Sequence, residues 1–302
     1  MKKTLEALFH QPIVSVKTLG EQYDGRVNDV WLISLQDKTE YVVKSPKTAR
    51  EESEFVFGIK MIYGVDDRTV QEHIDQINQK LSHMNSSFHI PEVVRKVKKA
   101  GRHFYVMEKV EGTTCTSFEG RSSDFYKDYG RKLAQLHSYR IDFFGAVYGA
   151  EKKHLREFHA VLKKAVSKLI DRYYADQPEF HCYAEIVLQK IEKLRTPDST
   201  SLILIDLDPS QYIENDDQVT SLVDTEYVVY GPAAFDFIAL EYLLTKEAAR
   251  NVQLGYEEIC PLPRDLHEVR ECYRFVSLLL DIHGSWDLKK WMNHPILFDS
   301  YR

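Results

Sequence analysis

Apolar and polar positions alternate differently in the two parts of the chain, with short strand-like runs first and longer helical stripes after them. Runs of four to six apolar residues between turn residues are typical of strands, and apolar positions at a spacing of three or four are typical of helices. The predicted strands are 13–16, 30–35, 41–44, 90–94 and 103–107. The predicted helices are 49–63, 69–84, 125–137, two within 151–195, one at 237–249, and one or two within 266–291.

The stretch 201–244 departs from this pattern, because two apolar runs in it end abruptly in acidic residues. Asp206 and Asp208 follow the run 202–205, and Asp224 follows the run 221–223. A single Asp at a strand end usually just bonds the local backbone. Two acidic strand ends separated by the length of one hairpin favour a functional site instead, because carboxylates at the ends of paired strands can share a Mg²⁺ ion.

Composition and charge exclude several classes of protein. The chain has 302 residues, which suits two domains or one domain in two lobes, and its net charge of −6 is not that of an electrostatic nucleic-acid binder. The four cysteines are scattered without a C-x-x-C pair, which disfavours a disulfide framework or a zinc site and favours a reducing compartment. No signal peptide and no membrane-spanning run is evident, so we expect a cytoplasmic protein that binds neither membrane nor nucleic acid.

The motifs around these acids resemble those of a known family. The tripeptide 204–206 with Gln211, then Asp224, then the run 231–236, follow the order H-G-D-x-x-x-x-N, h-h-D and G-x-P-x-x-D. This order is similar to that of the aminoglycoside phosphotransferase and choline kinase-like family, small-molecule relatives of the protein kinases. The run 133–137, Leu-Ala-Gln-Leu-His, is similar to the family's L-A-x-L-H helix, in which His137 is structural.

The resemblance implies an α+β, bilobal, protein kinase-like fold. Residues 1–110 would form the first lobe, an antiparallel sheet with helices that binds the nucleotide. Residues 111–302 would form a larger, mostly helical lobe that carries the catalytic hairpin 202–226. The implied cofactors are ATP or GTP with Mg²⁺, and the implied partner is a small molecule with a hydroxyl group.

The same resemblance implies roles for individual residues. Asp206 would orient or deprotonate the acceptor hydroxyl, and Asp236 would support its loop from within. Asp224 and residue 211 would hold metal on the phosphates, and Lys44 would reach the α and β phosphates. Asn28 belongs to a Gly25-x-x-Asn28 turn over the nucleotide. The Glu108 carbonyl and the Val110 amide would contact adenine.

Three positions depart from the family pattern. Leu204 stands where the pattern has His, and Asp208 stands where His is frequent. Gln211 replaces Asn, and its extra methylene displaces the side-chain oxygen by about 1 Å, whereas Mg²⁺ requires its oxygen ligands at a distance of about 2.1 Å. Three outcomes stay open: the loop adjusts, Asp208 becomes a ligand, or the site is weak.

Two questions stay open at this level. Glu51, Glu52 and Glu72 are alternative partners for Lys44. The expected activity is transfer of a γ-phosphate to a small-molecule hydroxyl, and the alternative is a catalytically degenerate nucleotide-binding protein with a sensory role. A protein kinase is disfavoured, because the chain lacks a glycine-rich G-x-G-x-x-G and an A-P-E-like run. The acceptor and the oligomeric state are not readable from these patterns.

Overall fold

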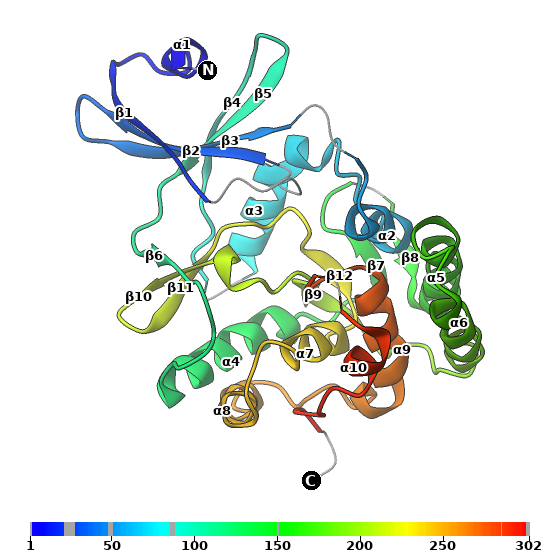
Figure 1. Cartoon of the computed structure of the whole chain (residues 1–302). Coiled ribbons are helices and arrows are strands. Elements are labelled where there is room, and N and C mark those ends of the chain that lie inside the picture. Colours follow the sequence, from blue (N-terminus) through cyan, green and yellow to red (C-terminus); the bar gives the residue numbers. More distant parts are fainter. Residues whose placement is uncertain are drawn as a thin grey trace.

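The first part of the chain forms a five-stranded antiparallel sheet (Figure 1). The computed structural model describes residues 2–20, 28–47, 51–84, 88–149, 151–284 and 286–299. The strands are β1 (Ile13–Thr18), β2 (Asn28–Leu35), β3 (Glu40–Pro46), β4 (Val93–Lys99) and β5 (Arg102–Glu108), in the order β1-β2-β3-β5-β4. The meander and the second hairpin predicted from the sequence are confirmed.

A small hydrophobic core lies against this sheet. Strand β2 alternates between buried and less buried positions, so that Trp31, Ile33 and Leu35 point to one face. Leu5 and Leu8, in and just after helix α1 (Lys2–Glu6), pack in the same core. The sheet therefore has its own apolar layer, separate from the larger core of the molecule.

Two helical stretches between β3 and β4 belong to that larger core. Helix α2 (Glu54–Tyr63) begins after Ser53, whose hydroxyl accepts a hydrogen bond from the Val56 amide at 3.3 Å. The next stretch is a 3₁₀ turn, η1 (Val70–His73), that continues as α3 (Ile74–His83). Both predicted apolar stripes are buried, but they pack with the helical body rather than with the sheet core. The start of the predicted helix 49–63 falls partly on residues 48–50, outside the described part.

Seven helices and two small sheets make up the rest of the described chain (Figure 1). The helices are α4 (Ser123–Ser138), α5 (Phe158–Tyr173), α6 (Pro178–Ile191), α7 (Ala234–Leu240), α8 (Lys246–Glu257), α9 (Leu266–Leu279) and α10 (Leu288–Met292). One sheet has the order β11-β10-β6 and the other β8-β7-β12-β9. Their strands are β6 (Thr113–Thr114), β7 (Phe143–Ala146), β8 (Lys153–His154), β9 (Ser201–Ile203), β10 (Tyr212–Asn215), β11 (Gln218–Leu222) and β12 (Val229–Gly231). Short 3₁₀ turns are η2 (Leu155–Glu157) and η3 (Pro209–Gln211).

Two sequence-based expectations about this part are wrong. The predicted helix 237–249 is two helices, α7 and α8, because the Thr245 hydroxyl caps a new helix by accepting a hydrogen bond from the Ala248 amide at 3.2 Å. The strands that precede Asp206 and Asp224 do not pair with each other. Strand β9 pairs with β12, and β11 pairs with β10.

A buried ion-pair cluster ties the C-terminal segment to the helical body. Glu241 is fully buried and lies 2.6 Å from the Arg274 guanidinium and 3.4 Å from that of Arg270. Its carboxylate also accepts hydrogen bonds from the amides of Leu297 and Phe298. None of the helices in the described part has the length and apolar character needed to cross a membrane.

We expect Glu241→Gln to lower the free energy of unfolding by about 3–5 kcal/mol, because it leaves two arginines buried without a carboxylate. Urea denaturation measures this. The control is Glu192→Gln, which breaks the exposed pair with Lys163 and should cost less than about 1 kcal/mol. Equal losses in the two variants would contradict the role of burial.

Candidate functional site

The β10–β11 hairpin brings Gln211 and Asp224 side by side. Tyr212 pairs with Leu222 in the register of the hairpin, and the Val223 amide donates a hydrogen bond to the Gln211 carbonyl at 2.9 Å. Asp224 is the next residue along the chain. Backbone pairing therefore brings the two residues close together in space, although they are thirteen positions apart in the sequence.

A buried carboxylate shapes the loop that carries Asp206. Asp236, in the first turn of α7, is fully buried and accepts hydrogen bonds from the amides of Leu204 and Ile205 at about 3.0 Å. His137 lies 3.2 Å from the same carboxylate, so its place in the site is structural. Ile205 stands where the family pattern has glycine and adopts φ of +60°. Because a β-branched residue is strained in this conformation, the Asp236 bonds are what hold the turn.

Asp206 lies in a half-buried position at the end of this turn. Burial, together with the nearby carboxylates of Asp208 and Asp224, raises the pKa of its carboxyl to about 7. Hydrogen bonds from the Asp208 amide, at 3.2 Å, and from the Gln211 side chain act in the opposite direction. A carboxyl with a pKa near 7 exchanges protons readily at neutral pH, as a general base must.

Lys44 joins the sheet to this hairpin. Its side chain is 7% exposed, and its ammonium contacts the Asp224 carboxylate, lies 3.2 Å from Glu226 and donates to the Val223 carbonyl at 3.2 Å. Burial by itself lowers the pKa of Lys44, but the carboxylates of Asp224 and Glu226 outweigh it and raise the pKa above its ordinary value. The amine is therefore held as a cation inside the protein.

The glutamate that pairs with Lys44 beside Asp224 is Glu226, and none of the three glutamates considered from the sequence. Glu52 instead pairs with Arg172 at 2.8 Å, and Glu51 and Glu72 are exposed. Gln71, in the 3₁₀ turn η1, contacts the same glutamate. Its side-chain amide donates a hydrogen bond to the Glu226 carboxylate at 2.7 Å. Glu226 lies two residues after Asp224, and this proximity was the sequence signal that could have identified it.

Helix α3 is attached to the same segment at a second point. The Asn78 side chain accepts a hydrogen bond from the Thr225 hydroxyl and donates one to the Pro91 carbonyl at 2.8 Å. Gln71 and Asn78 therefore hold residues 224–226 from one side while Lys44 holds them from the other. Movement of α3 would change the environment of the lysine.

The remaining predicted residues lie in three places. Asn28 is buried at the start of β2, opposite Pro46 of β3, while Gly25 of the same motif lies outside the described residues. Glu108 ends β5, and the Val110 amide makes no hydrogen bond to any residue that the structure describes. Asp208 is exposed and caps η3 by accepting from the Ser210 amide at 2.7 Å, so its side chain is occupied locally.

The donor chemistry of the hairpin fits Mg²⁺. In the described part of the chain no group of three or more His, Cys, Asp or Glu side chains is arranged to hold a metal. Mg²⁺, however, is commonly bound by one or two protein oxygens together with substrate phosphates. The half-exposed Asp224 carboxylate and the buried side-chain amide of Gln211 carry oxygens of this kind and are the groups here that could hold the ion.

A comparison with protein families identifies the class. Residues 22–272 match the model of the phosphotransferase enzyme family, so the chain belongs to this family. No curated protein sequence matches the chain.

Solved structures share the fold over nearly the whole chain. The ADP-bound aminoglycoside phosphotransferase APH(2'')-Ib is 17% identical, with 97% of this chain and 96% of that chain covered and a TM-score of 0.62. Macrolide 2'-phosphotransferase MphH from Brachybacterium faecium is 14% identical, with 97% of each chain covered and a TM-score of 0.58. A Plasmodium vivax ethanolamine kinase is 14% identical, with 96% and 82% covered and a TM-score of 0.57. The predicted fold class and the resemblance are therefore confirmed.

The pair formed by Gln71 and Glu226 generates a stability prediction. Glu226→Gln should lower the free energy of unfolding by about 3 kcal/mol, because it removes one carboxylate from a buried ammonium. Adding Gln71→Glu to this variant exchanges the two groups, and we expect it to restore at least half of the loss. Urea denaturation of the single and double variants measures the effect.

The control for that series is Glu72→Gln, an exposed change next to Gln71 that should shift the free energy of unfolding by less than about 0.5 kcal/mol. A double variant that is no more stable than Glu226→Gln alone would show that Gln71 does not share the environment of Lys44.

Proposed function

We propose that this protein transfers the γ-phosphate of ATP or GTP to a hydroxyl group of a small molecule. The observation that carries the proposal is the contact of the buried Lys44 ammonium with Asp224, beside an Asp206 carboxyl whose pKa is raised to about 7. Membership of the phosphotransferase family supports the same reaction class. Phosphoryl transfer depends on positioning and on charge stabilisation, which are what these groups provide.

In the proposed reaction the acceptor oxygen attacks the γ-phosphorus and the bond to the bridging β,γ-oxygen breaks, releasing the nucleoside diphosphate. Asp206 accepts the hydroxyl proton and later returns it to solvent. Lys44 neutralises charge on the phosphates of the nucleotide. Asn28 and the backbone of Glu108 and Val110 are the proposed contacts to the rest of the nucleotide.

Mg²⁺ would be held by Asp224 and Gln211, and it would neutralise phosphate charge when bound. Of the alternatives left open by the sequence, ligation by Asp208 is the least supported, since its carboxylate caps η3. The backbone hydrogen bond from Val223 to Gln211, which keeps Gln211 close to Asp224, supports Gln211 as the second ligand. The four free cysteines suit the reducing, cytoplasmic location expected for an enzyme that uses ATP.

Asp206→Asn should reduce transfer by about 10²–10⁴-fold, because an amide cannot accept the hydroxyl proton. Nucleotide affinity should change less than about threefold, since Asp206 acts on the acceptor side. A coupled assay of nucleoside diphosphate release, with calorimetry for binding, measures both. Asp208→Asn, an exposed neighbour, is the matched control and should retain most of the activity. Normal turnover in Asp206→Asn would refute the assignment.

Asp224→Asn should abolish the Mg²⁺-dependent part of ATP binding and leave the weaker metal-free binding. Calorimetry with and without Mg²⁺ tests this, and an unchanged Mg²⁺ dependence would contradict the ligand assignment.

The wild-type protein, assayed with ATP and GTP against aminoglycosides, macrolides, ethanolamine, choline, homoserine and sugars, tests the function itself. Transfer to one of these acceptors supports the enzyme. Mg²⁺-dependent nucleotide binding without transfer to any of them would favour the alternative of a nucleotide-binding protein that has lost catalysis.

A further inference from the structure

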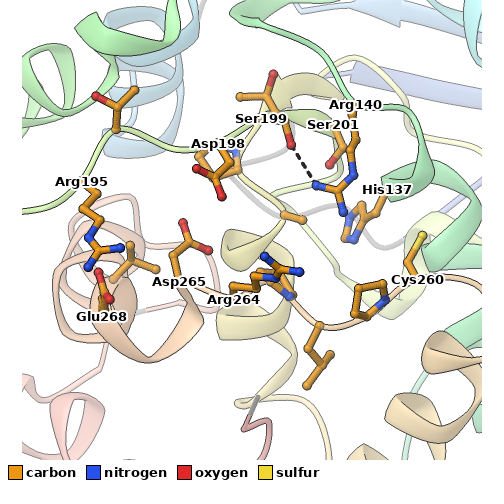
Figure 2. Close-up of a pocket in the computed structure, with 18 of the residues that line it drawn as sticks. His137, Arg140, Arg195, Asp198, Ser199, Ser201, Cys260, Arg264, Asp265 and Glu268 are labelled. Atoms are coloured by element: carbon orange, nitrogen blue, oxygen red, sulfur yellow. Dashed lines mark hydrogen bonds between the residues drawn. The ribbon is translucent and has the colours of Figure 1, made fainter. Parts of the chain in front are cut away.

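A cavity of about 540 Å³ lies in the helical body, away from the residues assigned to transfer (Figure 2). Its walls come from the end of α4, the segment 195–201 that leads into β9, the turn before α7, and residues 260–269. Ser201, on the wall, is the first residue of β9, whereas Asp206 follows the other end of that strand. None of the proposed nucleotide, metal or catalytic residues lines the cavity.

The cavity carries charges of both signs that are not paired with one another. Three arginines line it, Arg140, Arg195 and Arg264, and three acids, Asp198, Asp265 and Glu268. No ion pair within 4 Å involves any of these six side chains within the described part of the chain. The one hydrogen bond of the Arg140 guanidinium goes to the Ser199 hydroxyl, at 3.2 Å.

The charges are also separated in space. Figure 2 shows Arg140 near Ser199, Ser201 and His137, and Arg264 in the lower centre of the view, beside Asp265. The three acids lie on the other side of the cavity from Arg140, together with Arg195. Opposite charges that face one another across a cavity without pairing can each take up a separate group of a ligand.

One buried group on these walls lacks a hydrogen-bond partner, and one acid on the opposite side is partly buried beside two other carboxylates. Ser201 is 3% exposed, and its hydroxyl has no hydrogen-bond partner among the described residues. Such an orphan hydroxyl costs free energy unless something bonds it. On the opposite side, burial raises the pKa of Asp265, and the carboxylates of Asp198 and Glu268 raise it further. A cation bound there would relieve the repulsion within this group.

His137 lines the same cavity but has no nitrogen free for a ligand. One ring nitrogen lies 3.1 Å from the Tyr256 hydroxyl and the other 3.2 Å from Asp236. The arginines therefore remain as the groups that can bind an anion from this side.

We propose that this cavity is a second ligand site, which binds a small zwitterion. Its anionic group, a carboxylate or a phosphate, lies between Arg140 and Arg264. Its ammonium group lies against Asp198 and Asp265. A volume of about 540 Å³ is within the range of small-molecule sites. The site does not depend on the proposed phosphoryl transfer.

The test uses the full chain and two probes, 4-aminobutyrate and its phosphonate counterpart 3-aminopropylphosphonate. Calorimetric or NMR titration should show saturable binding of at least one, and the better probe distinguishes a carboxylate site from a phosphate site. Butyrate, propylphosphonate and butylamine each lack one charge, and we expect them to bind at least tenfold more weakly. Equal binding of a probe and its one-charge analogues would overturn the zwitterion proposal, as would the absence of saturable binding of both probes.

Variants locate the site. Arg264→Gln and Asp265→Asn should each weaken probe binding about tenfold, whereas the exposed changes Arg250→Gln and Glu247→Gln in α8 should leave it unchanged. Asp224→Asn should also leave it unchanged. Thermal unfolding confirms that each variant is folded, and Arg140→Gln gives a second change at the anionic end. Binding that survives all three cavity variants, or that is lost in Asp224→Asn, would place the probe elsewhere and refute the proposal.

Discussion

The arrangement of the site depends on one buried cation, the ammonium of Lys44. A charge taken out of water must be paired, and in this protein the partners come from a different part of the chain, the segment 223–226. The sheet that carries Lys44 has a hydrophobic core of its own. The ion pairs and the attachment of α3 through Gln71 and Asn78 therefore hold the sheet and the hairpin in a fixed relation.

A second constraint acts on the loop before Asp206. Ile205 has a positive φ that an L-residue with a branched β-carbon adopts only at a cost, and the buried Asp236 accepts hydrogen bonds from the amides of Leu204 and Ile205. The family pattern meets the same need with glycine. In this chain an isoleucine occupies the position, so the conformation rests on the tertiary contact with α7 rather than on the freedom of the backbone.

The proposed transfer site and the cavity are connected through shared elements. Strand β9 begins at the cavity with Ser201 and leads to the loop of Asp206, and His137 lines the cavity while it bonds Asp236. An occupant of the cavity would thus lie one side chain away from the group that holds the catalytic loop. The two sites nevertheless differ in chemistry. In the proposed transfer site carboxylates surround a single lysine, whereas the cavity is lined by arginines and acids that form no ion pairs with one another in the described part of the chain.

Local patterns in the sequence determined much of this protein. Periodicity placed the five strands of the first sheet and most helices, because burial of one face imposes a spacing on apolar residues. The order of Asp206, Asp224 and Asp236 identified the family. Only the tertiary structure decided that Glu226 pairs with Lys44, that β9 and β11 belong to different sheets, and that residues between 137 and 269 enclose a cavity. These outcomes depend on contacts between residues that are far apart in the sequence. The local spacing of apolar residues carries no information about such contacts.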